Sequence, residues 1–322
     1  MTLGYWIESP GRGTLRDVDV TAPSDAALEL EAVCSGVSPG TERLVGLGRV
    51  PASMHASMAC RGMQGTFSLP LLYGYSFVGR VRGGADAGRR AFAMRPHQQR
   101  AYALPEELAW LPDEVPDARA TLFPNLETAR NAVWDAAPAD GERALVLGAG
   151  PVGLLCAFVL SHDRPGEPVT VVERDPARRA RAAALPWVAE ALAPEDVSED
   201  AYAHALHTTA TTAGLQLAID AVGFEGQVLE LSWYGDAPVS LRLGESFHSQ
   251  RKRLVCSQVG AVAPSQRAAG YTARRDAVLA LLTDPALDAL LSSPTPFERA
   301  PETFAALYES RLDALCPVLT YS

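Results

Sequence analysis

Three glycines with the spacing of a phosphate-binding turn give the sequence its clearest chemical signal. Gly148, Gly150 and Gly153 follow a short apolar segment, 144–147, and precede an apolar run with helical character, 154–160. The first glycine permits a tight turn, and the second lets the backbone approach a pyrophosphate. The third allows the helix to pack closely on the strand.

Pro151 and Val152 complete this segment at the start of the expected helix. Free N–H groups and the helix dipole attract phosphate charge at such a position. A strand, a glycine turn and a helix in this order predict a dinucleotide-binding site. A glycine-rich turn in a different α/β fold is the alternative.

An acidic residue follows the next strand. Glu173 comes directly after the apolar segment 169–172, 20 residues beyond the last of the three glycines. A carboxylate here hydrogen-bonds the adenosine ribose hydroxyls and repels a 2′-phosphate, so we predict NAD as the cofactor. Arg174 and the arginines after it could accept a phosphate, so NADP is not excluded. The carboxylate could also serve only the helix that starts at Asp175-Pro176.

Length and composition limit the class of protein. A chain of 322 residues with 48% hydrophobic content is long enough for two globular domains. The net charge of −10 and the pI near 5.1 argue against a nucleic acid or an anionic membrane as partner. Five scattered cysteines without a CxxC pair, no signal-peptide pattern and no apolar run of roughly 18 residues favour a cytoplasmic protein.

Periodicity predicts the elements that position these residues. The N-terminal part contains short β segments at 27–33, 77–81 and 90–94, and a helical pattern follows at 119–137. Beyond the glycine turn, strand patterns alternate with helical patterns, which predicts a doubly wound parallel sheet. The elements expected after the turn span residues 169–172, 177–184, 205–209, 214–222, 226–231 and 253–259.

This order of elements resembles the medium-chain dehydrogenase/reductase superfamily over almost the whole chain. Residues 35–42 (SGVSPGTE), 73–79 (YGYSFVG) and 124–129 (PNLETA) are similar to the three segments that carry the catalytic zinc ligands in zinc alcohol dehydrogenases. The resemblance implies a Rossmann dinucleotide-binding domain at 121–264. It also implies a β-rich, GroES-like catalytic domain formed by 1–120 and 265–322.

Each implied zinc-ligand position is altered. Ser38 replaces the first cysteine, Tyr75 replaces the histidine, and Pro124 or Asn125 stands at the third position. Catalytic zinc needs Cys, His or carboxylate ligands that converge around one open position, so we predict a zinc-independent member with no bound metal. The chain is similar to a zinc-less subgroup that includes bacteriochlorophyllide a dehydrogenase-like proteins, in the strings 38–43, 48–51, 73–75, 96–98, 231–235 and 247–260.

Without zinc, a hydrogen-bond donor must polarise the carbonyl or accept the alcohol proton. Tyr75 could donate that proton or simply fill the pocket. His97 could relay protons, bind substrate, or be an ordinary surface or core histidine. Ser38 and Thr41 stand where the superfamily places a hydroxyl relay, but they could equally cap the next helix. Asn125 could line the cleft.

Further cofactor contacts are expected where strands end at the ligand-binding edge of the sheet. Thr208 follows the strand pattern that ends near His207, and Trp233 and Tyr234 follow the next one. We predict Thr208, Trp233 and Tyr234 as cofactor contacts.

These observations favour an NAD(P)-dependent oxidoreductase that transfers hydride between nicotinamide and the carbonyl or secondary alcohol of a small organic substrate, which could be a biosynthetic ring system. An enone or quinone reductase of the same superfamily is one alternative. A non-catalytic nicotinamide-binding redox sensor or assembly partner is another. The resemblance also implies a homodimer formed through sheet edges near the end of the nucleotide-binding domain.

Overall fold

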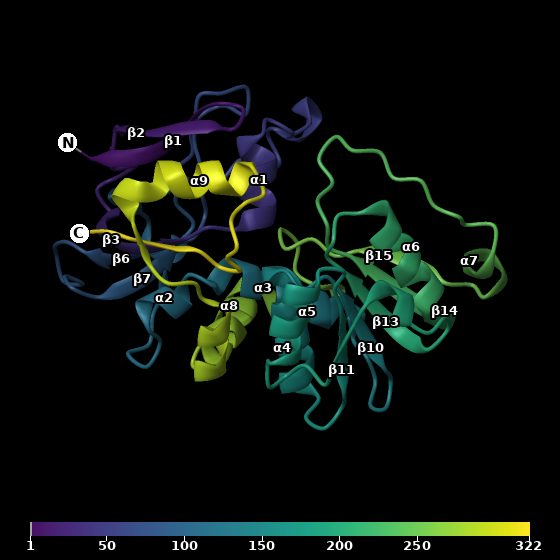
Figure 1. Cartoon of the computed structure of the whole chain (residues 1–322). Helices are drawn as coiled ribbons and strands as arrows, with labels where there is room; N and C mark the ends of the chain where they lie inside the picture. The colour runs from purple at the N-terminus through teal and green to yellow at the C-terminus, as the bar shows by residue number, and fades with distance from the viewer. Residues whose placement is uncertain (1) are drawn as a thin grey trace. The chain divides into compact units, whose positions relative to one another are not determined.

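The computed structural model describes residues 2–322, which divide into two compact units. Unit 1 comprises the residues up to Pro124 together with Leu279–Ser322, and unit 2 comprises Asn125–Val278. Two helices run across these boundaries, α3 (Phe123–Ala136) and α8 (Gly270–Leu281) (Figure 1). No helix within residues 2–322 is both long and apolar enough to cross a membrane.

Unit 2 contains a six-stranded sheet in which every neighbouring pair of strands is parallel. The strand order is β12-β11-β10-β13-β14-β15, which confirms the predicted parallel sheet. The chain connects β10 to β11 through one helix and β13 to β14 through another, as expected for parallel strands. The strands are β10 (Ala144–Leu147), β11 (Val169–Val172), β12 (Glu190–Leu192), β13 (Tyr202–His207), β14 (Val222–Glu230) and β15 (Arg253–Cys256).

The helix after the glycine turn is the central helix of unit 2. In α4 (Pro151–Asp163), all residues from Gly153 to Leu160 are buried, which explains why this stretch is apolar on every face. The Trp187 indole N–H donates to the carbonyl of Leu154 at 3.1 Å and so links α4 to the segment that follows α5. The remaining helices of this unit are α5 (Pro176–Ala183), α6 (Thr212–Ala221), α7 (Ser246–Ser249) and the 3-10 helices at Pro194–Asp196 and Pro264–Gln266.

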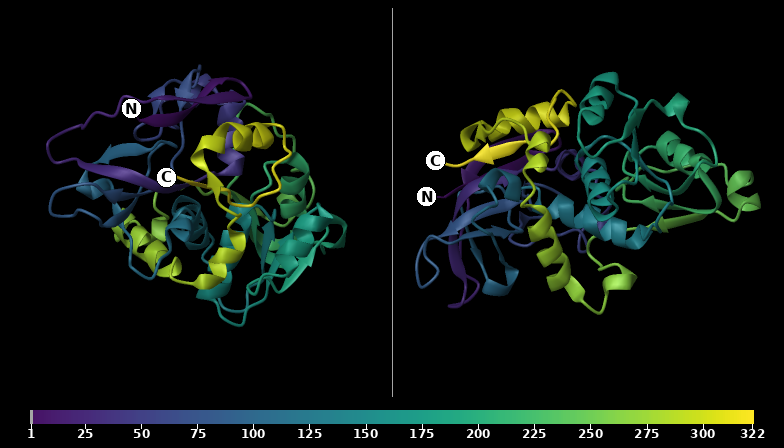
Figure 2. Two further views of the ribbon diagram at one scale, coloured as in Figure 1. Left: turned by 60° about the vertical axis from the view of Figure 1, so that its left-hand side comes forward. Right: turned by 90° about the horizontal axis from the view of Figure 1, so that it is seen from below.

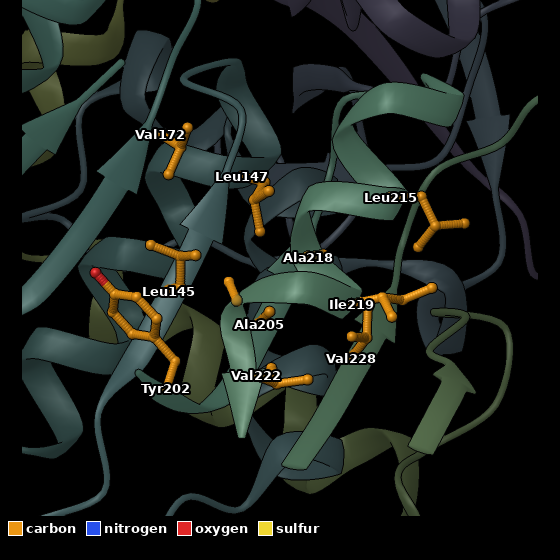
Figure 3. Packing of buried hydrophobic residues seen from close by; sticks show 11 residues of the cluster. Leu145, Leu147, Val172, Tyr202, Ala205, Leu215, Ala218, Ile219, Val222 and Val228 are labelled. Atoms are coloured by element: carbon orange, nitrogen blue, oxygen red, sulfur yellow. The ribbon is translucent and has the colours of Figure 1, made fainter. Parts of the chain in front are cut away.

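One apolar cluster holds α6 against the sheet (Figure 3). Its side chains come from β10, β11, β13 and β14 and from the inner face of α6, which the Thr211 hydroxyl caps by accepting the Gly214 N–H at 3.1 Å. Because these strands are buried, their sequences are nearly continuous apolar runs and do not alternate. The labelled members are Leu145, Leu147, Val172, Tyr202, Ala205, Leu215, Ala218, Ile219, Val222 and Val228.

Unit 1 contains two β-sheets. The smaller sheet has the order β2-β1-β5-β4, and the larger has the order β16-β17-β3-β6-β7-β9, with β8 paired to β3. Most pairs are antiparallel, so the β-rich part predicted from the sequence is confirmed. The strands are β1 (Leu3–Ser9), β2 (Arg12–Asp17), β3 (Leu28–Gly36), β4 (Gln64–Gly65), β5 (Leu71–Leu72), β6 (Phe77–Val81), β7 (Arg90–Ala93), β8 (Arg100–Ala103), β9 (Ala109–Trp110), β16 (Thr295–Pro296) and β17 (Val318–Thr320).

The C-terminal part of unit 1 packs on its N-terminal part. Helix α9 (Ala300–Tyr308) lies against α1 (Pro39–Gly46) and the β1–β2 pair (Figures 1 and 2). The Phe304 ring stacks on Tyr5 with centroids 4.1 Å apart. Gly46 is required for this packing, because a Cβ there would lie 2.0 Å from the Tyr308 ring.

The helix expected at 119–137 is divided in two. Helix α2 (Asp117–Ala120) ends at Thr121, and α3 begins at Phe123. Pro124 explains the break, because it has no N–H to donate and is tolerated only in the first turn of a helix. The strand expected at 205–209 begins earlier and ends at His207, so the threonines after it belong to the loop.

Candidate functional site

The glycine turn has the geometry that its sequence predicts. Gly148 has a φ of +107°, and a Cβ on Gly153 would lie 1.9 Å from the Gly148 carbonyl oxygen. Gly150 is the N-cap of α4, and a Cβ there would meet nothing within 4 Å. The turn therefore leaves open space at Gly150, directly before the half-buried first helical residues, Pro151 and Val152.

The carboxyl ends of four strands meet at this turn. Leu147 at the end of β10 is in register with Val172 of β11 and His207 of β13, and His207 is in register with Glu230 of β14. The Thr208 hydroxyl donates to the Leu147 carbonyl at 2.8 Å. This row is the edge at which parallel α/β sheets bind ligands.

Glu173 lies at the β11 side of this row and is buried. Its Oε2 accepts the N–H of Ala149, inside the glycine turn, at 3.0 Å, and its Oε1 accepts the N–H of Asp175 at 3.0 Å. The carboxylate thus links the turn to the start of α5, and each oxygen keeps a lone pair for another donor. Arg174 is exposed beside it.

On the other side of β10, a buried histidine pairs with a glutamate. His207 Nδ1 lies 2.9 Å from Glu230 Oε2, and the Tyr234 hydroxyl donates to the same oxygen at 3.0 Å. The Tyr234 ring is stacked on the imidazole with centroids 6.5 Å apart. Trp233, the other predicted contact in this loop, is half-buried.

In unit 1, three of the predicted catalytic residues come together. The Tyr75 hydroxyl hydrogen-bonds the side chains of Ser38 and Thr41. Ser38 is the N-cap of α1, but its side chain makes no capping bond, so the capping alternative does not account for it. Burial and the nearby charge of Glu42 raise the pKa of Tyr75 despite these hydrogen bonds, so the phenol keeps its proton at neutral pH.

His97 lies deeper in unit 1 and has no direct access to solvent. Its Nε2 is 2.8 Å from Glu42 Oε2, and its Nδ1 is 2.7 Å from the Ser35 hydroxyl. Glu42 Oε1 accepts the Ser38 N–H at 2.7 Å. Both ring nitrogens therefore have hydrogen-bond partners within the unit.

This hydrogen-bond chain continues to the C-terminal segment. The Ser35 hydroxyl lies 2.8 Å from the Tyr321 hydroxyl, which is itself near the end of the chain. Burial raises the pKa of Tyr321, so it also is a neutral phenol. The resulting series runs from Ser38 through Glu42, His97 and Ser35 to Tyr321.

The positions at which the resemblance would place zinc ligands carry Ser38, Tyr75 and either Pro124 or Asn125. Within residues 2–322, no group of three or more His, Cys, Asp or Glu side chains is arranged to hold a metal ion. Asn125 is buried in α3. Glu42 and His97, two potential ligands in unit 1, are paired with each other.

Sequence reasoning missed several members of these clusters. Glu42, Ser35 and Tyr321 were not singled out, and Glu230 was not recognised as the partner of His207. One local feature of the sequence pointed to Glu42. It stands four residues after Ser38, and a side chain at that distance can reach the backbone N–H of the helix N-cap. The others are joined only by tertiary contacts.

Comparisons with known proteins identify the fold. No family model and no curated protein matches the chain. Solved structures match over nearly their whole length: 2R,3R-butanediol dehydrogenase from Bacillus subtilis has a TM-score of 0.78 at 16% identity and covers 99% of both chains. A short chain alcohol dehydrogenase from Escherichia coli CFT073, in complex with NADH, has a TM-score of 0.79 at 14% identity and covers 99% of both. Alcohol dehydrogenase from Thermus sp. ATN1 has a TM-score of 0.76 at 19% identity, with 99% of this chain and 100% of that chain covered.

The turn geometry predicts that two alanine substitutions destabilise the fold to different extents. Gly153→Ala places a Cβ against the Gly148 carbonyl, so the backbone must shift at a cost of about 3 kcal/mol. Gly150→Ala adds a methyl group in open space and costs at most about 1 kcal/mol, through the N-cap. Thermal melts followed by circular dichroism measure both. Equal melting temperatures for the two variants would contradict this packing.

Proposed function

We propose that this chain is a zinc-independent oxidoreductase of the medium-chain dehydrogenase/reductase superfamily. It transfers hydride between a nicotinamide cofactor and the carbonyl or secondary alcohol carbon of a small organic substrate. Unit 2 is its Rossmann dinucleotide-binding domain, and unit 1 is its GroES-like catalytic domain. The observation that carries the proposal is the glycine turn with Glu173 beside it, at the carboxyl edge of a parallel sheet. The fold shared with dehydrogenases supports it.

The residues at the glycine turn fit a dinucleotide. The open backbone at Gly150 leaves room for a pyrophosphate, and the free N–H groups at the start of α4 can bind its charge. Thr208, Trp233 and Tyr234 are further contacts, on the β13 and β14 side of the turn. When bound, the nicotinamide supplies or accepts the hydride.

NAD is the preferred cofactor. The carboxylate of Glu173 is held next to the glycine turn by two backbone N–H groups, where it can accept hydrogen bonds from ribose hydroxyls. Its fixed negative charge would repel a 2′-phosphate. Arg174 is exposed, so solvent screens its attraction for a phosphate, and this attraction does not outweigh the repulsion from the buried carboxylate.

No catalytic zinc is required in this proposal. Ser38, Tyr75 and either Pro124 or Asn125 stand where zinc alcohol dehydrogenases carry ligands, and Ser38 and Tyr75 are hydrogen-bonded to each other. Hydroxyl and amide groups are poor zinc ligands compared with thiolate, imidazole and carboxylate. The residues present do not fit the metal, and no step here depends on it.

Tyr75 takes over the polarising role. Its phenol is neutral because burial and the charge of Glu42 raise its pKa, so it can donate a hydrogen bond to a carbonyl oxygen and stabilise the charge that develops there. Ser38 and Thr41 hydrogen-bond the phenol oxygen and can return a proton to it.

The Glu42–His97 pair positions these hydroxyl groups. Glu42 accepts the Ser38 N–H while His97 holds its other oxygen, so the first turn of α1 is fixed beside Tyr75. Glu42 and His97 are separated by 55 positions in the sequence, so this contact is tertiary and not local. His97 therefore acts through Glu42, not by contact with the substrate.

The protein is expected to work in the cytoplasm as a homodimer. All five cysteines are free, which suits a reducing compartment. Strand β15 lies at the edge of the unit 2 sheet, and its Leu254 and Val255 side chains are each 39% exposed. An exposed apolar edge strand is a surface that a second copy can cover.

Tyr75→Phe tests the proposed polarising group. It removes one hydroxyl and keeps the ring, so kcat for a reducible carbonyl should fall by about 10²-fold or more while the NADH Kd stays within about twofold. Tyr73→Phe is the matched control, because the Tyr73 ring lies 6.2 Å from that of Tyr75 but its hydroxyl bonds to Cys60. Full activity of Tyr75→Phe would show that another group carries this role.

Cofactor preference tests the role of Glu173. Wild-type protein should bind NADH at least about tenfold more tightly than NADPH, and Glu173→Gln should remove most of that difference because the repelling charge is gone. Glu167→Gln is the control, since Glu167 also accepts a backbone N–H, from Gly141 at 2.9 Å, away from the glycine turn. Tighter binding of NADPH to the wild type would refute the assignment.

Light scattering tests the dimer. The wild type should have twice the 34.2 kDa mass of one chain, and Val255→Lys, which places a charge on the β15 edge, should be monomeric at micromolar concentration. A monomeric wild type, or an unchanged dimer in the variant, would exclude this edge as the interface.

A further inference from the structure

A largely buried carboxylate–imidazole pair lies at the carboxyl ends of β13 and β14, apart from the residues proposed for hydride transfer. His207 is fully buried, and the Glu230 side chain is 13% exposed. His207 Nδ1 faces Glu230 at 2.9 Å, and Nε2 faces the Thr209 hydroxyl at 2.6 Å. Because a carboxylate only accepts hydrogen bonds, Nδ1 carries the proton. With the imidazole neutral, the pair has one net negative charge.

The surroundings keep this charge in place. Burial alone would raise the pKa of Glu230, but hydrogen bonds from His207 and from the Ser232 backbone N–H, the latter at 2.7 Å, hold it below its usual value. Tyr234 donates a further bond. Glu230 is therefore ionised at neutral pH although it is mostly buried.

The pair is also held rigidly. A Cβ on Gly214, in the first turn of α6, would lie 2.3 Å from the Thr209 hydroxyl oxygen and 2.8 Å from His207 Nε2. The Thr209 hydroxyl bonds in turn to Thr211, the N-cap of that helix, at 2.8 Å. The glycine thus allows the helix to start directly against the pair, so the charge has a fixed position.

The strand order places this charge on one side of the glycine turn. Glu173 follows β11, on one side of β10, whereas His207 and Glu230 end β13 and β14, on the other side. In a doubly wound sheet the two halves of a dinucleotide lie on opposite sides of the point where the strand order reverses. If Glu173 binds the adenosine ribose, the nicotinamide half faces β13 and β14.

We propose that Glu230, held by His207, is a subsite for the nicotinamide half of the cofactor that favours its oxidised form. The inference rests on the proposed dinucleotide function. The oxidised nicotinamide ring carries a positive charge, and the reduced ring is neutral. A fixed carboxylate attracts only the first, so Glu230 lowers the Kd for NAD⁺ relative to that for NADH.

The test is the ratio of the two dissociation constants, measured by titration calorimetry with NAD⁺ and NADH in the same buffer. Glu230→Gln should raise Kd(NAD⁺)/Kd(NADH) by roughly 3- to 10-fold. The ratio is informative because a general loss of order at the site would weaken the binding of NAD⁺ and of NADH to the same extent.

Glu142→Gln is the matched control. Glu142 pairs with His204 at 3.0 Å and so forms the same kind of carboxylate–imidazole contact, at the amino end of β10 and β13. In the Glu142→Gln variant, Kd(NAD⁺)/Kd(NADH) should stay within about twofold of the wild-type value. The amino edge of the sheet does not face the ligand.

A second variant, Ser232→Lys, tests the same charge in case Glu230→Gln does not fold. Ser232→Lys adds a positive charge beside Glu230 at a half-buried position and keeps the backbone N–H that the carboxylate accepts. It should shift the ratio in the same direction. An unchanged ratio in a folded Glu230→Gln or in Ser232→Lys would overturn the subsite and leave dinucleotide binding intact. Failure of the wild type to bind either form would overturn the proposed function as well.

Discussion

The contact between Gly153 and the Gly148 carbonyl is the constraint on which unit 2 depends. No side chain fits between these residues, so β10 must turn directly into α4, whose apolar residues then fill the space beside the sheet. The tight turn brings the start of α4 to the same edge as the ends of β11 and β13. Glu173 and Thr208 can bond to the turn only because this edge is so compact. Open space at Gly150, beside the start of a helix, is the outcome of packing that glycine alone permits.

Each unit contains a largely buried glutamate that pairs with a buried histidine. Glu42 is held by His97 and by a backbone N–H, and Glu230 is held by His207, a backbone N–H and a phenol. An unpaired carboxylate in such surroundings would be costly, and these hydrogen bonds offset that cost. In unit 1 the result is an ordered helix start beside Tyr75. In unit 2 the result is a fixed charge at the ligand-binding edge of the sheet.

Local features of the site could be predicted from the sequence, whereas its tertiary pairs could not. The order of strand, glycine turn and helix is local, and the parallel sheet follows from the alternation of strand and helix patterns. Tyr75, Ser38 and Thr41 were identified through motif positions, and they lie together. The Ser35–Tyr321 contact joins residues 286 apart, and no pattern of spacing indicates it. The helix break before Pro124 was missed because the apolar periodicity continues through it.

The most direct test of the central claim is deuterium transfer by metal-free protein. The chain would be treated with a chelator, its zinc content measured, and the protein incubated with NADH deuterated at nicotinamide C4 and a panel of ketones. The account predicts that deuterium appears on the carbinol carbon of a product in the absence of zinc. Transfer that occurs only after zinc is restored would contradict it, and so would saturable NADH binding with no transfer to any ketone.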